Sequence, residues 1–327
     1  MTTYKALKGK KVKFLASDPP ATAGEGQVWY NGADYKASVQ VEAWASGGAL
    51  NTGRHHIGGA GTQTAALGYG GTAGSNEAAT VSEEYNGSAW AEGNNLNTGR
   101  NSISNIGLQT AALCAGGHTG TTYINNSEEY NGTSWAEGNN LGTARTGEGS
   151  FGIQTASVVA GGYAGGGVPG VLTNVEEYNG TSWSEVTDIP AIRSENSGLG
   201  ILTAGLMLGG TSTGPGSSIQ AEAFEYDGTN WTAAGNMVTP RRFNGSAGTQ
   251  TVGITFGGNT ASGAVANTEN YDGSSFSTGV SLTSAIDKHG SASSGTQTSS
   301  LSFGGNPSVT ATEEFTFAKI VKTLTDS

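Results

Sequence analysis

Paired glutamates are the side chains of this sequence best suited to acid–base chemistry. They recur at Glu83-Glu84, Glu128-Glu129, Glu176-Glu177 and Glu313-Glu314. Two carboxyl groups that flank a glycosidic bond are the machinery of most glycoside hydrolases. Adjacent residues of a β-strand, however, point to opposite faces of the sheet, and a catalytic pair is normally unique in a chain. The recurrence therefore favours a structural role, and we predict no catalytic residue and no enzymatic activity.

A series of arginines repeats in step with these acidic pairs. Five arginines each lie ten residues after a recurring tryptophan, whereas the sixth unit has Ile286 at that position; they are Arg54, Arg100, Arg145, Arg193 and Arg241. A buried charge needs a partner, and a guanidinium can bind a carboxylate through two bonds. We expect each arginine to pair with a glutamate of the repeat, and the structural set includes Glu84, Glu129, Glu177 and Glu225. The alternative is a ring of arginines at a channel mouth that binds an anionic ligand.

The remaining reactive side chains do not indicate a metal or a cofactor. His55, His56, His118 and His289 lack the spacing of a zinc site. A single cysteine, Cys114, excludes an intramolecular disulfide framework, and its apolar surroundings predict a small core residue. We therefore predict no metal site and no bound cofactor.

Composition and charge narrow the class of protein. Glycine accounts for 55 of 327 residues, against a usual share of about 7%, and charged residues for 13%. The net charge is −11, and residues 1–16 hold five lysines and no acid, so the remainder has 10 basic and 26 acidic residues, or −16. An acidic body argues against binding of nucleic acid through phosphates. No apolar run approaches the ~20 residues that span a membrane, and no signal peptide is recognisable.

One eight-residue stretch organises the chain. EEYNGTSW occupies residues 128–135 and 176–183, EEYNGSAW occupies residues 83–90, and weaker copies lie at 224–231 and 269–276. Asn-Gly and Asp-Gly favour the type I′ turn, in which both central residues take positive φ. Each copy is therefore predicted to be a hairpin whose second strand begins at an aromatic residue: Trp90, Trp135, Trp183, Trp231 or Phe276.

The spacing of the aromatic residues predicts a β-propeller. Trp44 and the five aromatics above are separated by 46, 45, 48, 48 and 45 residues, and a Gly-Gly doublet that ends a short apolar run recurs six times. Each unit reads as four short strands, a to d, which is the pattern of a propeller blade. We predict an all-β, six-bladed propeller over residues 39–327, closed by an N-terminal strand around Trp44 that completes the last blade. Residues 1–38 form a separate arm.

The loops after the Gly-Gly doublets are the parts of the propeller that do not repeat. They cover residues 72–82, 118–127, 163–175, 211–221, 259–268 and 306–312, and the strand order places them on one face. Variable loops on a rigid scaffold commonly carry binding sites. Tyr123, Tyr163 and His118 are the side chains there best suited to stacking on a sugar, so we predict them as ligand-binding residues. The alternatives are spacer loops and contacts to another subunit.

Two resemblances bear on function. The Gly-Gly doublet followed by a tyrosine and a tryptophan resembles a kelch-type repeat. Residues 96–100, 61–67 and 128–135 are similar to repeat units of virion proteins from tailed phages, especially marine and cyanobacterial ones, and this likeness covers residues 39–315. Residues 19–31 are also similar to segments of phage tail and fibre proteins.

These resemblances imply a virion protein made in the host cytoplasm. The expected role is a tail or tail-fibre component that recognises the host, with the arm bound to other virion proteins and the propeller bound to a host surface glycan. The likeness to fibre proteins implies a homotrimer. The alternatives are a purely architectural subunit, such as a capsid decoration or tail connector, and a polysaccharide-degrading enzyme.

Overall fold

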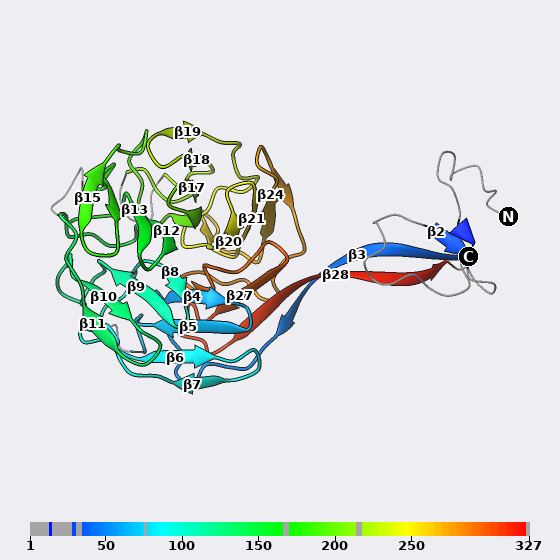
Figure 1. The fold of residues 1–327 in the computed structure, drawn as a ribbon, viewed down its shortest axis with the longest axis horizontal. Coiled ribbons are helices and arrows are strands. Elements are labelled where there is room, and N and C mark those ends of the chain that lie inside the picture. The colour runs from blue at the N-terminus through cyan, green and yellow to red at the C-terminus, as the bar shows by residue number, and fades with distance from the viewer. Residues whose placement is uncertain are drawn as a thin grey trace. The chain divides into compact units, whose positions relative to one another are not determined.

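A computed structural model describes residues 13–14, 28–30, 35–74, 77–165, 170–213 and 218–324. All regular structure in these residues is β, and no helix occurs among them. Six small antiparallel sheets are arranged as the blades of a propeller around a common axis (Figure 1). The predicted all-β, six-bladed fold is confirmed.

Five blades are four-stranded meanders in sequence order. The first has β4 (Gly58–Thr62), β5 (Ala65–Tyr69), β6 (Ser82–Tyr85) and β7 (Trp90–Glu92). The second has β8 (Ile106–Leu108), β9 (Ala111–Ala115), β10 (Ser127–Tyr130) and β11 (Trp135–Glu137). The third has β12 (Gly149–Ile153), β13 (Ala156–Ala160), β14 (Val175–Tyr178) and β15 (Trp183–Val186). The fourth has β16 (Ser197–Ile201), β17 (Ala204–Leu208), β18 (Ala223–Tyr226) and β19 (Trp231–Ala233). The fifth has β20 (Gly245–Thr249), β21 (Val252–Phe256), β24 (Thr268–Tyr271) and β25 (Phe276–Thr278), with a short hairpin of β22 (Asn259–Thr260) and β23 (Gly263–Ala264) in its loop.

The sixth blade joins the two ends of the repeat array. It consists of β26 (Gly290–Ser291), β27 (Ser299–Phe303), the start of β28 (Thr312–Leu324) and the end of β3 (Tyr35–Ser46), in that order across the sheet. Trp44, at the end of β3, is buried against Phe256 of the fifth blade and Phe315 of β28. The N-terminal strand therefore completes the last blade, as the missing fourth strand of the final repeat predicts.

The chain divides into two compact units. Residues 44–315 form the propeller, and residues 1–43 together with 316–327 form the other unit. In the second unit, β1 (Lys13–Phe14) pairs parallel with β2 (Val28–Tyr30), and β2 pairs antiparallel with β3. Most of the predicted arm, including Lys5, Lys8, Lys10, Lys11 and the Asn31-Gly32 turn, lies outside the described residues.

The turns between the third and fourth strands differ from the predicted type. Tyr85 pairs with Trp90 across a four-residue loop, and the same register recurs in later blades. Only the glycine has positive φ, 89° at Gly87, so the type I′ prediction is wrong. The Asn86 side chain accepts hydrogen bonds from the N–H groups of Ser88 and Ala89, at 3.0 and 2.9 Å. Asparagine and aspartate are therefore needed for their side-chain oxygen rather than for a left-handed backbone.

Glutamines of the Gly-x-Gln-Thr element hold neighbouring blades together. The Gln109 amide donates to the carbonyls of Ala66 and Tyr85 in the preceding blade, at 3.0 and 2.8 Å. Gln154, Gln250 and Gln297 repeat this double contact. Because each amide donates to two carbonyls of the preceding blade, this part of the repeat stabilises blade boundaries.

The first-to-second strand turns surround the axis at one end, and the last blade covers that end. Ser294 donates its N–H to Gly61 and its hydroxyl to the carbonyl of Gly107, at 2.9 and 2.8 Å. The N–H of Gly248 donates to the carbonyl of Gly295 at 3.0 Å. One segment of the sixth blade thus binds the first, second and fifth blades, so the open end of the axis is the one that bears the variable loops.

Candidate functional site

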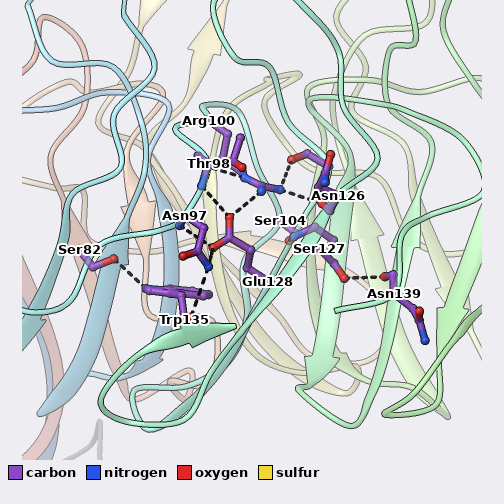
Figure 2. A network of polar contacts seen from close by, with 12 residues as sticks. Ser82, Asn97, Thr98, Arg100, Ser104, Asn126, Ser127, Glu128, Trp135 and Asn139 are labelled. Atoms are coloured by element: carbon purple, nitrogen blue, oxygen red, sulfur yellow. Dashed lines mark hydrogen bonds and ion pairs between the residues drawn. The ribbon is translucent and has the colours of Figure 1, made fainter. Parts of the chain in front are cut away.

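The arginine series lies inside the blades. Arg100 and Glu128 are both fully buried, and the guanidinium Nη2 lies 2.7 Å from the carboxylate (Figure 2). Arg100 Nη1 also donates to the carbonyls of Gly116 and Asn126, at 3.2 and 2.7 Å. Glu128 in turn accepts the N–H groups of Asn97 and Thr98, at 2.7 and 3.1 Å. The pair therefore ties the chain segment that enters the blade to its second and third strands.

The same pair recurs in three other blades, with the glutamate that occupies the position of Glu128 in each repeat. Arg54 pairs with Glu83, Arg145 with Glu176, and Arg241 with Glu269, at 2.6 to 3.0 Å. The fourth blade has Phe224 at that position, so Arg193 pairs with the half-exposed Glu222 and lies over the Phe224 ring. The arginines are buried, with relative exposures of 0 to 1%, and do not form a ring that a ligand could reach.

The glutamate at the next position of the repeat contacts a tyrosine of the following blade. The Tyr130 hydroxyl donates to Glu84 at 2.5 Å, and the same contact joins Tyr178 to Glu129, Tyr226 to Glu177, Tyr271 to Glu225 and Tyr85 to Glu314. Burial and the adjacent carboxylate raise the pKa of the Tyr85 phenol to about 12. At the remaining boundary Phe315 replaces the tyrosine and Asn270 replaces the glutamate, so both partners of the pair change together.

The tryptophans also act at blade boundaries. The indole N–H of Trp135 donates to Ser82 of the first blade, and that of Trp90 donates to Thr312 of the sixth, both at 3.0 Å. Trp231 donates to the carbonyl of Thr187 at 3.1 Å. Trp183, which packs on Tyr178 with ring centroids 4.9 Å apart, makes no such bond. The repeat residues thus build the scaffold, so a ligand would have to contact residues that do not repeat.

A ring of backbone hydrogen bonds surrounds the axis at the end that bears the variable loops. The residue two positions after each arginine, or after Ile286, donates its N–H to the carbonyl of its counterpart in the preceding blade, at 2.5 to 3.3 Å. The six residues of this axial ring are His56, Ser102, Gly147, Glu195, Phe243 and Lys288, with φ between 51° and 64°. A left-handed conformation costs a residue other than glycine roughly 1 kcal/mol or more. The inter-blade bonds offset that cost, and the side chains are free to differ.

The three residues predicted to bind a sugar meet at one pocket beside the axial ring. His118 packs on Tyr123 with ring centroids 4.8 Å apart, and Tyr123 meets Tyr163 edge-to-face at 5.5 Å. The pocket has a volume of about 180 Å³, and Asn101, Thr146 and the ring residues Ser102, Gly147, Glu195 and Phe243 complete its lining. We call it the mouth pocket.

The polar groups of the mouth pocket are positioned by the backbone. Thr146 and Tyr163 exchange backbone hydrogen bonds at 3.0 and 2.8 Å, and Asn101 and His118 do so at 3.0 Å. The N–H of Gly120 donates to His118 Nδ1 at 3.1 Å, which places the proton of the neutral imidazole on Nε2. Glu195 accepts from Arg242 at 2.6 Å. The pocket therefore combines aromatic faces with fixed donors and acceptors, as sugar-binding sites do.

A narrower chamber lies against the axial ring. Its lining includes Glu148, Asn196, Asn244 and His289, and its volume is about 50 Å³. Burial raises the pKa of the Glu148 carboxyl to about 8, and both carboxyl oxygens lack a hydrogen-bond partner. Burial lowers the pKa of His289 to about 4. Within the described residues, no group of His, Cys, Asp and Glu side chains could hold a metal ion.

Sequence reasoning missed four residues of this region: Glu195, Arg242, Phe243 and Lys288. Phe243 lines both the pocket and the chamber, and three of the four belong to the axial ring. The position two residues after each arginine varies from blade to blade, but the positions beside it vary as well, so the sequence pattern did not single it out. The prediction considered variability only in the loops after the Gly-Gly doublets.

Comparison with known proteins adds no family to these observations. No protein-family model matches the chain, and no curated protein matches it in sequence. Across the described residues, no helix is long and apolar enough to cross a membrane. The class of protein defined by the fold and its mouth pocket is a six-bladed β-propeller.

Proposed function

We propose that this chain is a virion protein of a tailed phage, in its tail or tail fibre, and that its propeller binds a host surface glycan at the mouth pocket. One observation carries the binding proposal: Tyr123, Tyr163 and His118 come from two different variable loops and meet at one pocket. Two edge-to-face tyrosines give a sugar ring an apolar face to pack on. Asn101, Thr146 and Glu195 supply hydroxyl-binding groups beside it.

The virion assignment rests on the similarity of the repeat units and of residues 19–31 to phage tail and fibre proteins. In a tail protein, the propeller would be the scaffold, because its repeating side chains bind one another within and between blades. The arm would attach the protein to other virion proteins, and the assembled state would be a homotrimer. Localising the subunit in a particle map tests this assignment, and a position within the capsid shell would support the architectural alternative.

A glycan microarray probed with the full-length protein tests binding. We expect selective binding that Tyr123→Ala and Tyr163→Ala each weaken by roughly tenfold or more, because stacking on an aromatic ring supplies a large share of sugar affinity. Ile201→Ala is the matched control, since Ile201 is 55% exposed at a first-to-second strand turn, away from the variable loops. Absence of glycan binding, combined with tight binding to a purified capsid or tail protein, would reject the adhesin role.

A further inference from the structure

The basic residues of the propeller are distributed unevenly between structural and surface positions. Residues 44–315 contain seven, namely Arg54, Arg100, Arg145, Arg193, Arg241, Arg242 and Lys288. The first five are buried in the blades. Only Arg242 and Lys288 remain to present positive charge to a ligand, in a protein whose net charge is −11.

These two cations lie on the same aromatic side chain. The Arg242 guanidinium carbon is 5.2 Å and the Lys288 ammonium nitrogen 5.6 Å from the centroid of the Phe243 ring. Arg242 also binds Glu195 at 2.6 Å. Among the described residues, by contrast, no carboxylate lies within ion-pair distance of the Lys288 ammonium. Lys288 is therefore the cation whose charge no ion pair neutralises among these residues.

The group formed by Arg242, Phe243 and Lys288 adjoins the mouth pocket. Phe243 and Glu195 line both the mouth pocket and the chamber to which Lys288 contributes. Burial lowers the pKa of His55 and of His56, and the positive charge of Lys288 lowers both further. The charge of Lys288 therefore acts on the side chains around it. The propeller thus places an aromatic subsite and a cationic subsite side by side.

We propose that the ligand is an acidic glycan, in which one sugar packs on Tyr123 and Tyr163 and a carboxylate-bearing sugar binds at Lys288 and Arg242. This inference rests on the proposed glycan-binding function. An acidic protein repels a polyanion at long range, so an anionic ligand needs a local cation. Lys288 supplies it in the chamber that shares Glu195 and Phe243 with the mouth pocket. A charge-assisted bond from an ammonium to a carboxylate is the stronger kind of hydrogen bond.

The test compares each uronate-containing oligosaccharide of a panel with its carboxyl-reduced form, by calorimetric titration of the full-length protein. We expect a uronate form to bind at least tenfold tighter than its reduced counterpart. Lys288→Met should remove that preference by lowering the affinity for the uronate form, and Lys288→Arg should restore it. Lys36→Met, which removes one lysine outside the propeller, is the charge-matched control. Circular dichroism melts verify that each variant is folded.

The outcomes separate the two proposals. Equal affinity for both forms, unaffected by Lys288→Met but lost in Tyr123→Ala, would overturn the acidic-ligand inference and leave glycan binding intact. No binding of either form across the panel would reject both. A preference for the uronate form that weakens equally in Lys36→Met and Lys288→Met would show attraction by overall charge, and would also overturn the assignment of Lys288.

Discussion

Replacing Arg100 with methionine tests how the blades are held together. Methionine keeps most of the volume of the arginine stem but removes the guanidinium. The carboxylate of Glu128, which is 0% exposed, would lose its ion pair at 2.7 Å. The carbonyls of Gly116 and Asn126 would lose their shared donor. Glu128 would keep the backbone N–H groups of Asn97 and Thr98 and the side-chain amide of Asn97 as donors.

The expected loss of unfolding free energy is about 3–5 kcal/mol, the range for removing one partner of a buried ion pair. The sixth blade explains why the effect should be this large. There Ile286 replaces the arginine, and Glu313 accepts the Thr283 N–H at 2.7 Å and forms no ion pair with any of the residues that the structure describes. Glu313 is 8% exposed, however, whereas Glu128 is sealed from water. Contact with water makes the unpaired Glu313 carboxylate tolerable in the sixth blade, whereas Glu128 in the second blade has no such contact.

Urea unfolding followed by circular dichroism measures this effect, with Arg100→Met/Glu128→Gln as the second arm. The double variant should regain most of the lost stability, because a neutral amide in that position no longer strands a buried charge. A loss below about 1 kcal/mol in the single variant would refute the argument. So would a double variant no more stable than Arg100→Met, since the damage would then not come from Glu128.

Three further outcomes are expected. Burial holds the pKa of Glu148 at about 8 against 4.5 for the free side chain, so the folded protein keeps a proton that the unfolded chain releases, and stability should fall as pH rises from about 4.5 to about 8. In chemical denaturation, Glu148→Gln should remove this dependence of the unfolding free energy on pH and stabilise the protein by on the order of 3 kcal/mol at pH 7 but not at pH 4.5. The same pH dependence of the unfolding free energy in both proteins would contradict this expectation. Tyr130→Phe breaks the bond to Glu84 and should cost about 1–2 kcal/mol in the same assay, and no measurable loss would mean that water replaces the tyrosine. Gly165→Ala would place a methyl group 2.6 Å from the Tyr123 ring at a φ of 79°, so glycan titration should show weakened binding with little change in melting temperature, and wild-type affinity would show that Tyr123 does not position the ligand.

The sequence alone was sufficient for the architecture because the repeat encodes strand number and order. Six Gly-Gly doublets and the spacing of the tryptophans predict six blades, and Trp44 without preceding strands predicts ring closure. Local detail was less accessible. The first strand of the second blade covers only Ile106–Leu108, and Asn105 just before it bonds to neighbouring blades: its side chain accepts the Gly59 N–H and its own N–H donates to Ser150.

Only the tertiary structure shows which glutamate of a pair binds the arginine and which contacts the next blade. Side chains of adjacent strand residues alternate between faces, so Glu128 and Glu129 had to differ, but the sequence does not say which face meets Arg100 and which meets the next blade. The structure assigns Glu128 to the arginine and Glu129 to the Tyr178 hydroxyl. The choice depends on how neighbouring blades stack, which is a long-range property.

The mouth pocket also depends on tertiary structure. The chemistry of Tyr123, Tyr163 and His118 was readable from their residue types, but their convergence was not, since it depends on the angle between two blades. The axial ring left no residue-type signature, because its bonds are made by backbone groups that every residue carries. The sequence thus determined the scaffold through repetition, and the packing of the blades around the axis determined where the non-repeating side chains of Phe243 and Lys288 meet.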